Sequence, residues 1–181
     1  EEIAKYLRKA GDVQGALREY QACVSIHPTN PRFHALLGSV LYNEGDADAA
    51  FPIFQRVHEL DSTYVTGLEM LARIHLERGE PARALDYARR LAGKRGERAS
   101  AAANHGLAAA RMELYAEAAE AYERAAGLEP DNPEHLERLG GLLLISGDHA
   151  RAERAFRALL HLDRSNVSAA VGLITALWMS C

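Results

Sequence analysis

The sequence predicts an all-α protein built from repeated pairs of antiparallel helices. Three observations lead to this fold class. The composition is dominated by strong helix formers, with alanine the commonest residue and β-branched and aromatic residues sparse. Small and aromatic residues recur at intervals of 34 residues along the chain. Within each interval the apolar residues follow the three- and four-residue spacing of amphipathic helices.

A column of alanines defines the 34-residue interval most clearly. Its members are Ala16, Ala50, Ala84, Ala118 and Ala152. Four residues further along lies a second column, which holds Tyr20, Phe54, Ala88, Tyr122 and Phe156. We expect the alanines to let two helix axes approach closely, and the aromatic rings to fill the space beside this contact.

Each interval contains two predicted helices of about 12 to 14 residues, joined by a short turn. In the interval 31–64, an apolar stripe over residues 37–41 is followed by the turn NEGD and by a second stripe over residues 47–57. Helices of this length are marginal alone in water, so their apolar stripes must be buried on neighbouring helices. Pro52 interrupts the second helix, and we expect a kink that is tolerated on its outer face.

The turns inside the repeats carry recognisable end signals for helices. Gly45 can take the left-handed conformation that ends a helix, and Asp46 can cap the next helix by accepting from its free N–H groups. The same signal recurs at Gly11-Asp12 and Gly147-Asp148, while Glu80-Pro81 and Glu113 depart from it. Between repeats, Asn30-Pro31 and Asn132-Pro133 combine a cap with a proline suited to a first helical turn.

The period divides the chain into a single array of repeats. We expect a truncated repeat over residues 1–30, complete repeats over 31–64, 65–98, 99–132 and 133–166, and the first helix of a sixth over 167–181. Both ends fall inside helices, so we expect this sequence to be a piece of a longer array. The apolar segment 167–179 would leave an open C-terminal end that self-associates.

The repeats resemble the tetratricopeptide repeat family. In the second repeat the resemblance rests on Leu37-Gly38, Ala50, Phe54, Val57 and Leu60, and in the fifth on Leu139-Gly140, Ala152, Phe156, Leu159 and Leu162. The fourth repeat matches at Gly106, Tyr115, Ala118, Tyr122, Ala125 and Pro130, with His105 where the family usually has leucine. The third departs at Ala88 and in the loop GKRGER. The resemblance implies a right-handed superhelical α-solenoid whose concave wall is formed by the first helices.

The sequence lacks the signatures of several catalytic and cofactor-binding classes. It contains no GxGxxG, GxxxxGK[ST], HExxH, GxSxG or paired CxxC motif, so we expect no enzyme activity, no cofactor and no metal site. With 21 basic and 25 acidic side chains the net charge is only −4, which does not favour a nucleic acid partner. The longest apolar segment, residues 167–179, is too short for direct membrane insertion.

Histidine, cysteine and basic residues suggest structural roles. His34, His75 and His105 lie at positions that usually pack, so we expect each to be partly buried and hydrogen-bonded. Cys23 and Cys181 form neither a disulfide framework nor a metal-ligand pattern, and they leave the redox compartment open. A basic group surrounds the loop after the third repeat and suits a solvated edge better than an RNA contact, since it lacks interleaved aromatic residues. This group consists of Arg89, Arg90, Lys94, Arg95 and Arg98.

The family resemblance implies a partner-binding groove on the first helices. The residues that it places there are Arg32, Tyr42, Met70, Arg73, Leu76, Asn104, Leu107, Arg111, Arg138 and Trp178, with Leu36, Leu144 and Ile145 beside them. Arginines among large apolar side chains suit an acidic, amphipathic protein segment, because guanidinium groups bind carboxylates while apolar groups bury the anchors.

The predicted function is therefore a non-catalytic scaffold for protein–protein interaction. In this hypothesis a peptide or helix of a partner protein binds in the concave groove, within a longer protein. Two alternatives remain open at the level of sequence. The repeats could recruit substrate for a catalytic domain outside this segment, or they could form a stacking subunit of a large multiprotein assembly.

Overall fold

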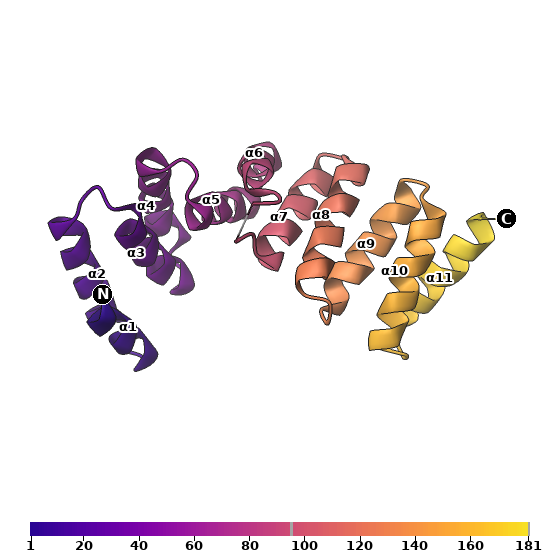
Figure 1. The fold of residues 1–181 in the computed structure, drawn as a ribbon, viewed down its shortest axis with the longest axis horizontal. Helices are drawn as coiled ribbons and strands as arrows, with labels where there is room; N and C mark the ends of the chain where they lie inside the picture. Colours follow the sequence, from indigo (N-terminus) through magenta and orange to yellow (C-terminus); the bar gives the residue numbers. More distant parts are fainter. Residues whose placement is uncertain (95, 181) are drawn as a thin grey trace. The chain divides into compact units, whose positions relative to one another are not determined.

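The computed structural model describes residues 1–94 and 96–180, and the all-α prediction is confirmed: this part of the chain contains helices and turns but no strand (Figure 1). The helices are α1 (Glu2–Lys9), α2 (Val13–Ile26), α3 (Pro31–Asn43), α4 (Ala47–Leu60), α5 (Val65–Glu77), α6 (Pro81–Leu91), α7 (Ala99–Arg111), α8 (Tyr115–Leu128), α9 (Pro133–Ile145), α10 (His149–Leu162) and α11 (Val167–Met179).

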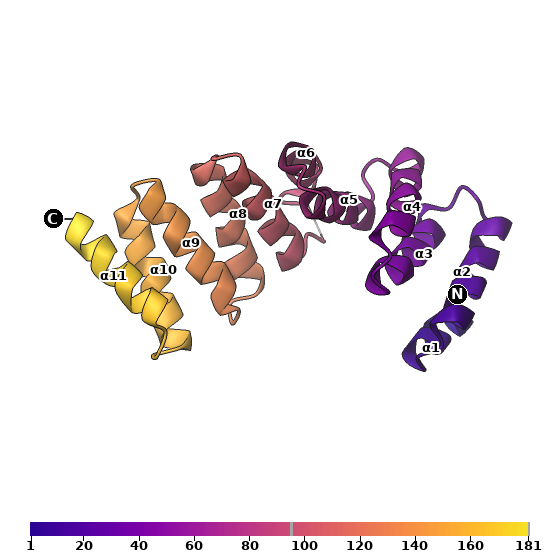
Figure 2. The same cartoon turned by 180° about the vertical axis from the view of Figure 1, so that it is seen from behind.

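The contacts divide the chain into two compact units, Glu1–Ile74 and His75–Cys181. In the first unit α2 packs against α1 and α3, and α3 packs against α4. In the second unit each helix from α7 to α11 packs on the next, and α9 also contacts α11 (Figure 2). Each unit has its own apolar core, the first around Tyr20 and the second around Tyr122 and Phe156.

The helices begin and end at the predicted signals. Asp46 caps α4 by accepting a hydrogen bond from Ala49 N at 2.9 Å, and Asn132 caps α9 by accepting from Glu134 N at 3.1 Å. Gly45 has a φ of +87°, which confirms the left-handed end of α3. Glu113 takes the same conformation, with a φ of 59°, although its side chain makes this conformation costlier by about 1–2 kcal/mol. The geometry of the turn is thus kept where the glycine is missing.

Pro52 is exposed, and α4 continues through it from Ala47 to Leu60. The ring lies at the sixth position of the helix, on the side away from the buried Phe54 and Val57. The expected position of Pro52 on the outer face is therefore confirmed, whereas the expected kink stays a prediction.

The alanine and aromatic columns form the packing seams that the period predicts. All five alanines of the first column are fully buried. The aromatic rings lie directly against glycines of the first helices. A Cβ added to Gly38 would lie 3.0 Å from Phe54 Cζ, one added to Gly106 would lie 2.5 Å from Tyr122 Cδ2, and one added to Gly140 would lie 2.7 Å from Phe156 Cζ. Close backbone approach therefore depends on glycine as well as on alanine.

Candidate functional site

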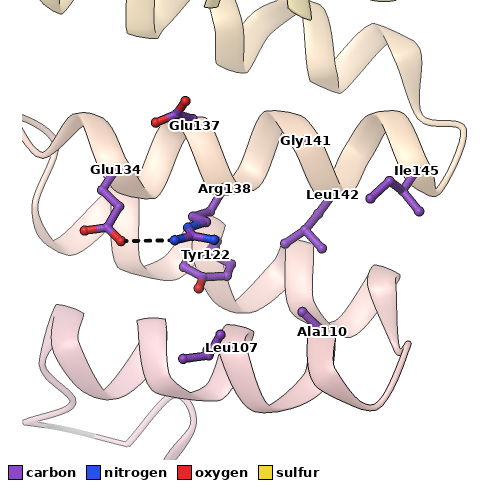
Figure 3. Close-up of a pocket in the computed structure, with 9 residues that line it drawn as sticks. All are labelled: Leu107, Ala110, Tyr122, Glu134, Glu137, Arg138, Gly141, Leu142 and Ile145. Atoms are coloured by element: carbon purple, nitrogen blue, oxygen red, sulfur yellow. Dashed lines mark ion pairs between the residues drawn. The ribbon is translucent and has the colours of Figure 1, made fainter. Parts of the chain in front are cut away.

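A cavity of about 650 Å³ opens between α7 and α9 in the second unit (Figure 3). Helix α8 contributes the ring of Tyr122 to it. The lining residues are Leu107, Ala110, Tyr122, Glu134, Glu137, Arg138, Gly141, Leu142 and Ile145. We call this cavity the α7–α9 groove. Helices α7 and α9 are the first helices of successive repeats, on which the family resemblance places the partner-binding groove.

The two ends of the α7–α9 groove differ in polarity. Figure 3 shows Glu134, Glu137 and Arg138 toward the start of α9, and Leu142 and Ile145 toward its end. Gly141 opens the cavity between these ends, because no atom lies within 4 Å of the place where its Cβ would stand. The groove can therefore bind a partner segment that places an apolar side chain against Leu142 and Ile145 and a charged group near Arg138.

The charged end consists mostly of weakly held groups. Arg138 Nη2 lies 3.7 Å from Glu134 Oε1, and the two side chains are 57% and 68% exposed. An exposed pair of this kind contributes little stability, so it can be exchanged for a partner's charge at small cost. Tyr122 is only 5% exposed, and its burial raises the pKa of the phenol, which stays a neutral hydrogen-bonding group.

The structure brings only some of the predicted groove residues together. Leu107, Arg138 and Ile145 line the α7–α9 groove. Asn104, one helical turn before Leu107, has its Nδ2 atom buried without a hydrogen-bond partner among the described residues. Arg111 donates from Nη1 to the carbonyl oxygen of Leu76 at 2.9 Å, so its guanidinium is partly committed to the backbone.

The remaining predicted residues lie elsewhere. In the first unit the Arg73 guanidinium stands 5.9 Å above the Tyr42 ring centroid, and it also lies 3.8 Å from Glu69 Oε1. Arg32 donates to the carboxylate of Glu1.

Met70 and Leu76 were expected to face a partner. They are instead only 7% and 5% exposed, so they offer little surface. Both side chains are apolar, and the spacing of apolar residues alone does not separate a core position from a groove position. Trp178, on α11, is 79% exposed.

A charged network that the sequence analysis missed lies between α6, α7 and α8. Arg89 donates from Nε and Nη2 to the two carboxylate oxygens of Glu117, at 2.8 and 2.6 Å. The ring of His105, 4% exposed, lies with Nε2 2.8 Å from Glu117 Oε1 and with Nδ1 2.9 Å from Arg124 Nη2. Since a guanidinium only donates, Nδ1 accepts from Arg124 and Nε2 carries the proton that it donates to Glu117.

This network sets the charge of Glu117. The Arg89 guanidinium, and more weakly His105, lower the pKa of the Glu117 carboxyl to about 2, against the opposing effect of burial. The prediction that His75 and His105 are buried and hydrogen-bonded is confirmed, with Nδ1 of His75 2.7 Å from Glu80 Oε2. His34, on α3, has Nε2 2.9 Å from the carbonyl oxygen of Pro28. These groups stabilise the repeats and lie outside the α7–α9 groove.

Other candidate chemistry from the sequence is as follows. Cys23 is a half-buried free thiol, whereas Cys181 and Arg95 lie outside the described residues. In the ranges 1–94 and 96–180, no three His, Cys, Asp or Glu side chains are grouped closely enough to hold a metal ion. None of the helices in this part of the chain has the length and hydropathy that a membrane span requires.

Comparison with known proteins identifies the repeat. A family model described as "Tetratricopeptide repeat" matches residues 2–64, 69–133 and 103–167. The fold is similar to that of MamA from Desulfovibrio magneticus RS-1, at 23% identity over 92% of this chain and 94% of that one, with a TM-score of 0.74. It is also similar to YrrB, described as a TPR protein with an unusual peptide-binding site, at 17% identity over 89% and 84%, with a TM-score of 0.80.

A third similar structure is PilF of Pseudomonas aeruginosa, at 18% identity over 99% of this chain and 80% of that one, with a TM-score of 0.74. No curated protein matches the sequence. At these identities the likeness to solved structures concerns the fold.

Proposed function

Because the chain belongs to the tetratricopeptide repeat family, we propose that it is a protein-interaction scaffold whose α7–α9 groove holds a peptide or helix of a partner protein. The observation that carries this proposal is the groove itself. It has the volume of a small-ligand site, an apolar end and a charged end, and it lies between two first helices. YrrB, which has a similar fold, is described as having a peptide-binding site.

The apolar end of the groove supports binding of an anchor side chain. Leu107, Leu142 and Ile145 line it from two helices, and Ile145 is 63% exposed. Burial of a partner's Leu, Met or aromatic side chain against these groups stabilises the complex by about 1.5–3 kcal/mol. An amphipathic helix that lays its apolar face along the groove presents such anchors at three- and four-residue spacing.

The charged end supports a partner with a carboxylate next to its apolar anchor. In the complex, the Arg138 guanidinium leaves its weak ion pair with the exposed Glu134 and binds the partner's carboxylate in a bidentate geometry. This partner chemistry matches the acidic, amphipathic segment that the sequence suggests. A repeat arm that recruits substrate for a catalytic domain elsewhere in a longer protein would use the same groove.

The proposal is tested by affinity capture from a lysate of the source organism. One variant fills the groove, and a control variant leaves the groove unchanged. Gly141→Leu places a side chain in the open centre of the cavity, whereas Gly127→Leu adds the same side chain on α8, where the Cβ also meets no atom within 4 Å. We expect wild type and Gly127→Leu to capture the same partner, and Gly141→Leu to lose it. Glu134→Gln should bind this partner more tightly than wild type does. A partner retained equally by Gly141→Leu and wild type would contradict groove binding, and a weaker complex with Glu134→Gln would contradict an acidic partner.

A second proposal, self-association, is favoured by the outer face of α11. This helix has no charged residue and exposes Val167, Val171, Ile174, Leu177, Trp178 and Met179. An apolar face of this extent favours a contact with a second copy of the chain. We expect sedimentation equilibrium to show reversible dimers that Val171→Glu/Ile174→Glu abolishes. A wild-type chain that stays monomeric at high concentration would contradict this proposal.

A further inference from the structure

The outer side of α10 carries a row of basic side chains. Arg154, Arg157 and His161 are separated by three and four residues, so they lie along one side of the helix. Arg164 follows in the turn after α10, and it borders the same shallow depression of about 210 Å³ as Arg157, Leu160 and His161. All four side chains are exposed. We call Arg154, Arg157, His161 and Arg164 the α10 stripe.

The charges of the α10 stripe are largely uncompensated. Neither Arg154 nor Arg164 has a side-chain ion pair or hydrogen bond with any residue that the structure describes. Arg157 has one partner, Glu153, whose Oε1 lies 2.8 Å from Arg157 Nη1, and the arginine remains 60% exposed. In contrast, Arg151 on the same helix is held between Glu123 and Asp148. The stripe therefore differs from the arginines that stabilise the stacking of second helices.

The repeat fold itself does not require positive charge at these positions. The corresponding residues of α8 and its following turn, 34 residues earlier, are Glu120, Glu123, Gly127 and Pro130. Those of α4 and its following turn are Pro52, Gln55, Glu59 and Ser62. Helices α4 and α8 pack on their first helices as α10 does, and all three begin and end at the same repeat positions. A packing role therefore does not explain the α10 stripe.

We propose that the α10 stripe binds an acidic segment of a partner protein, separately from the α7–α9 groove. The charges are spread over about 15 Å along the helix direction, which corresponds to about three turns of a partner helix. A helix with glutamates at three- and four-residue spacing places a carboxylate opposite each guanidinium. Leu160, which is half-buried at the edge of the depression, supplies an apolar contact beside these ion pairs.

Charge complementarity favours protein over nucleic acid as the occupant. The four residues of the stripe and Leu160 include no Phe, Tyr or Trp, and His161 is the one aromatic ring among them, so this surface lacks the series of aromatic side chains on which successive bases stack. The chain has a net charge of −4, and the neighbouring second helix α8 exposes Glu120 at the position that corresponds to Arg154, which repels a long polyanion. A short acidic segment meets only the stripe and avoids this repulsion.

The test uses fluorescence anisotropy with a short labelled peptide that has four glutamates at helical spacing, and with a matched peptide that has glutamines instead. Arg154→Glu and Arg164→Glu are each expected to weaken binding of the glutamate peptide by about five- to tenfold. The matched control is Arg18→Glu, because Arg18 is exposed on α2 at the same repeat position as Arg154 and its reversal changes the net charge equally. This control, and the groove variant Gly141→Leu, should leave the affinity within about twofold of wild type.

Each alternative outcome overturns the proposal in a recognisable way. Equal loss of affinity with Arg18→Glu and Arg154→Glu would show a general charge effect in place of a site. Equal binding of the glutamine peptide would exclude recognition of carboxylates. A labelled single-stranded oligonucleotide that binds through Arg154 and Arg164 while the glutamate peptide does not would assign the stripe to nucleic acid. Circular dichroism of each variant confirms that the helices are intact.

Discussion

Gly140→Ala and Gly141→Ala are expected to change stability in opposite directions, although the two glycines are adjacent on α9. The added methyl group of Gly140→Ala would lie 2.7 Å from Phe156 Cε1 and Cζ. The ring cannot yield easily, because it is 4% exposed and Gly172 of α11 packs against it as well. We expect the resulting overpacking to lower the free energy of unfolding by about 1–3 kcal/mol.

Gly141→Ala serves as the internal control. Its methyl group meets no atom within 4 Å, so only the intrinsic preference of alanine for helix acts, and we expect an increase in stability of about 0.5–1 kcal/mol. Urea titration of both variants, followed by circular dichroism, measures the two changes. If Gly140→Ala were as stable as Gly141→Ala, the close contact between α9 and α10 would not be the tight seam described above.

Glu117→Gln is expected to lower stability at neutral pH by about 2–3 kcal/mol, and the difference from wild type should disappear in acid. In the folded protein Arg89, and more weakly His105, hold the Glu117 pKa near 2, whereas an unfolded glutamate titrates near about 4.3. Because the folded pKa is the lower one, the stabilisation is fully present above about pH 4.3 and is lost as the pH falls toward 2. Each pKa unit corresponds to about 1.4 kcal/mol.

Denaturant titrations of wild type and Glu117→Gln at neutral pH and at several values below pH 4.3 test this window. Glu120→Gln is the matched control, because Glu120 is exposed on the same helix, and its side chain has no ion pair with any residue that the structure describes. We expect this control to stay within about 0.5 kcal/mol of wild type throughout. A constant difference between wild type and Glu117→Gln across the acid range would show that Arg89 and Glu117 do not form the described pair.

The fold could be predicted in detail because the same packing and helix-end residues recur in successive repeats. The alanine column, the aromatic column and the Gly-Asp turns each recur at 34 residues, and each has a direct local or nearest-neighbour cause. Glu113 shows the limit of this logic. The sequence marks it as an exception, yet the structure keeps the left-handed turn there, between two helices that pack on each other.

The candidate site could be predicted only in outline. The resemblance placed Leu107 and Arg138 on the groove, but it also placed Met70 and Leu76 there, which are buried. A repeat position tells which helix face a residue occupies, and it does not tell how closely the neighbouring repeat covers that face. The cavity includes Gly141, where no atom lies within 4 Å of the place that a Cβ would take.

The charged contacts between second helices left a signal in the sequence that was not used. Arg89 pairs with Glu117, and Glu123 pairs with Arg151, in both cases across 28 residues and between successive second helices. In an array with a 34-residue period, opposite charges at this separation lie side by side on neighbouring repeats. The separation of 28 residues between Arg89 and Glu117 therefore predicts that Arg89 is a structural residue. It would leave Arg89 out of the basic group around the loop after the third repeat.

The central claim, that the α7–α9 groove holds a partner segment, is tested most directly by site-specific crosslinking. A photoreactive benzoyl-phenylalanine is placed at Leu107, which lines the groove, or at Leu128, which is exposed at the end of α8 and away from this groove. After irradiation in a lysate of the source organism, mass spectrometry identifies the attached peptides. We expect one partner segment with an apolar anchor and an adjacent carboxylate to be attached at Leu107 and not at Leu128. Attachment at Leu128 alone would contradict the claim.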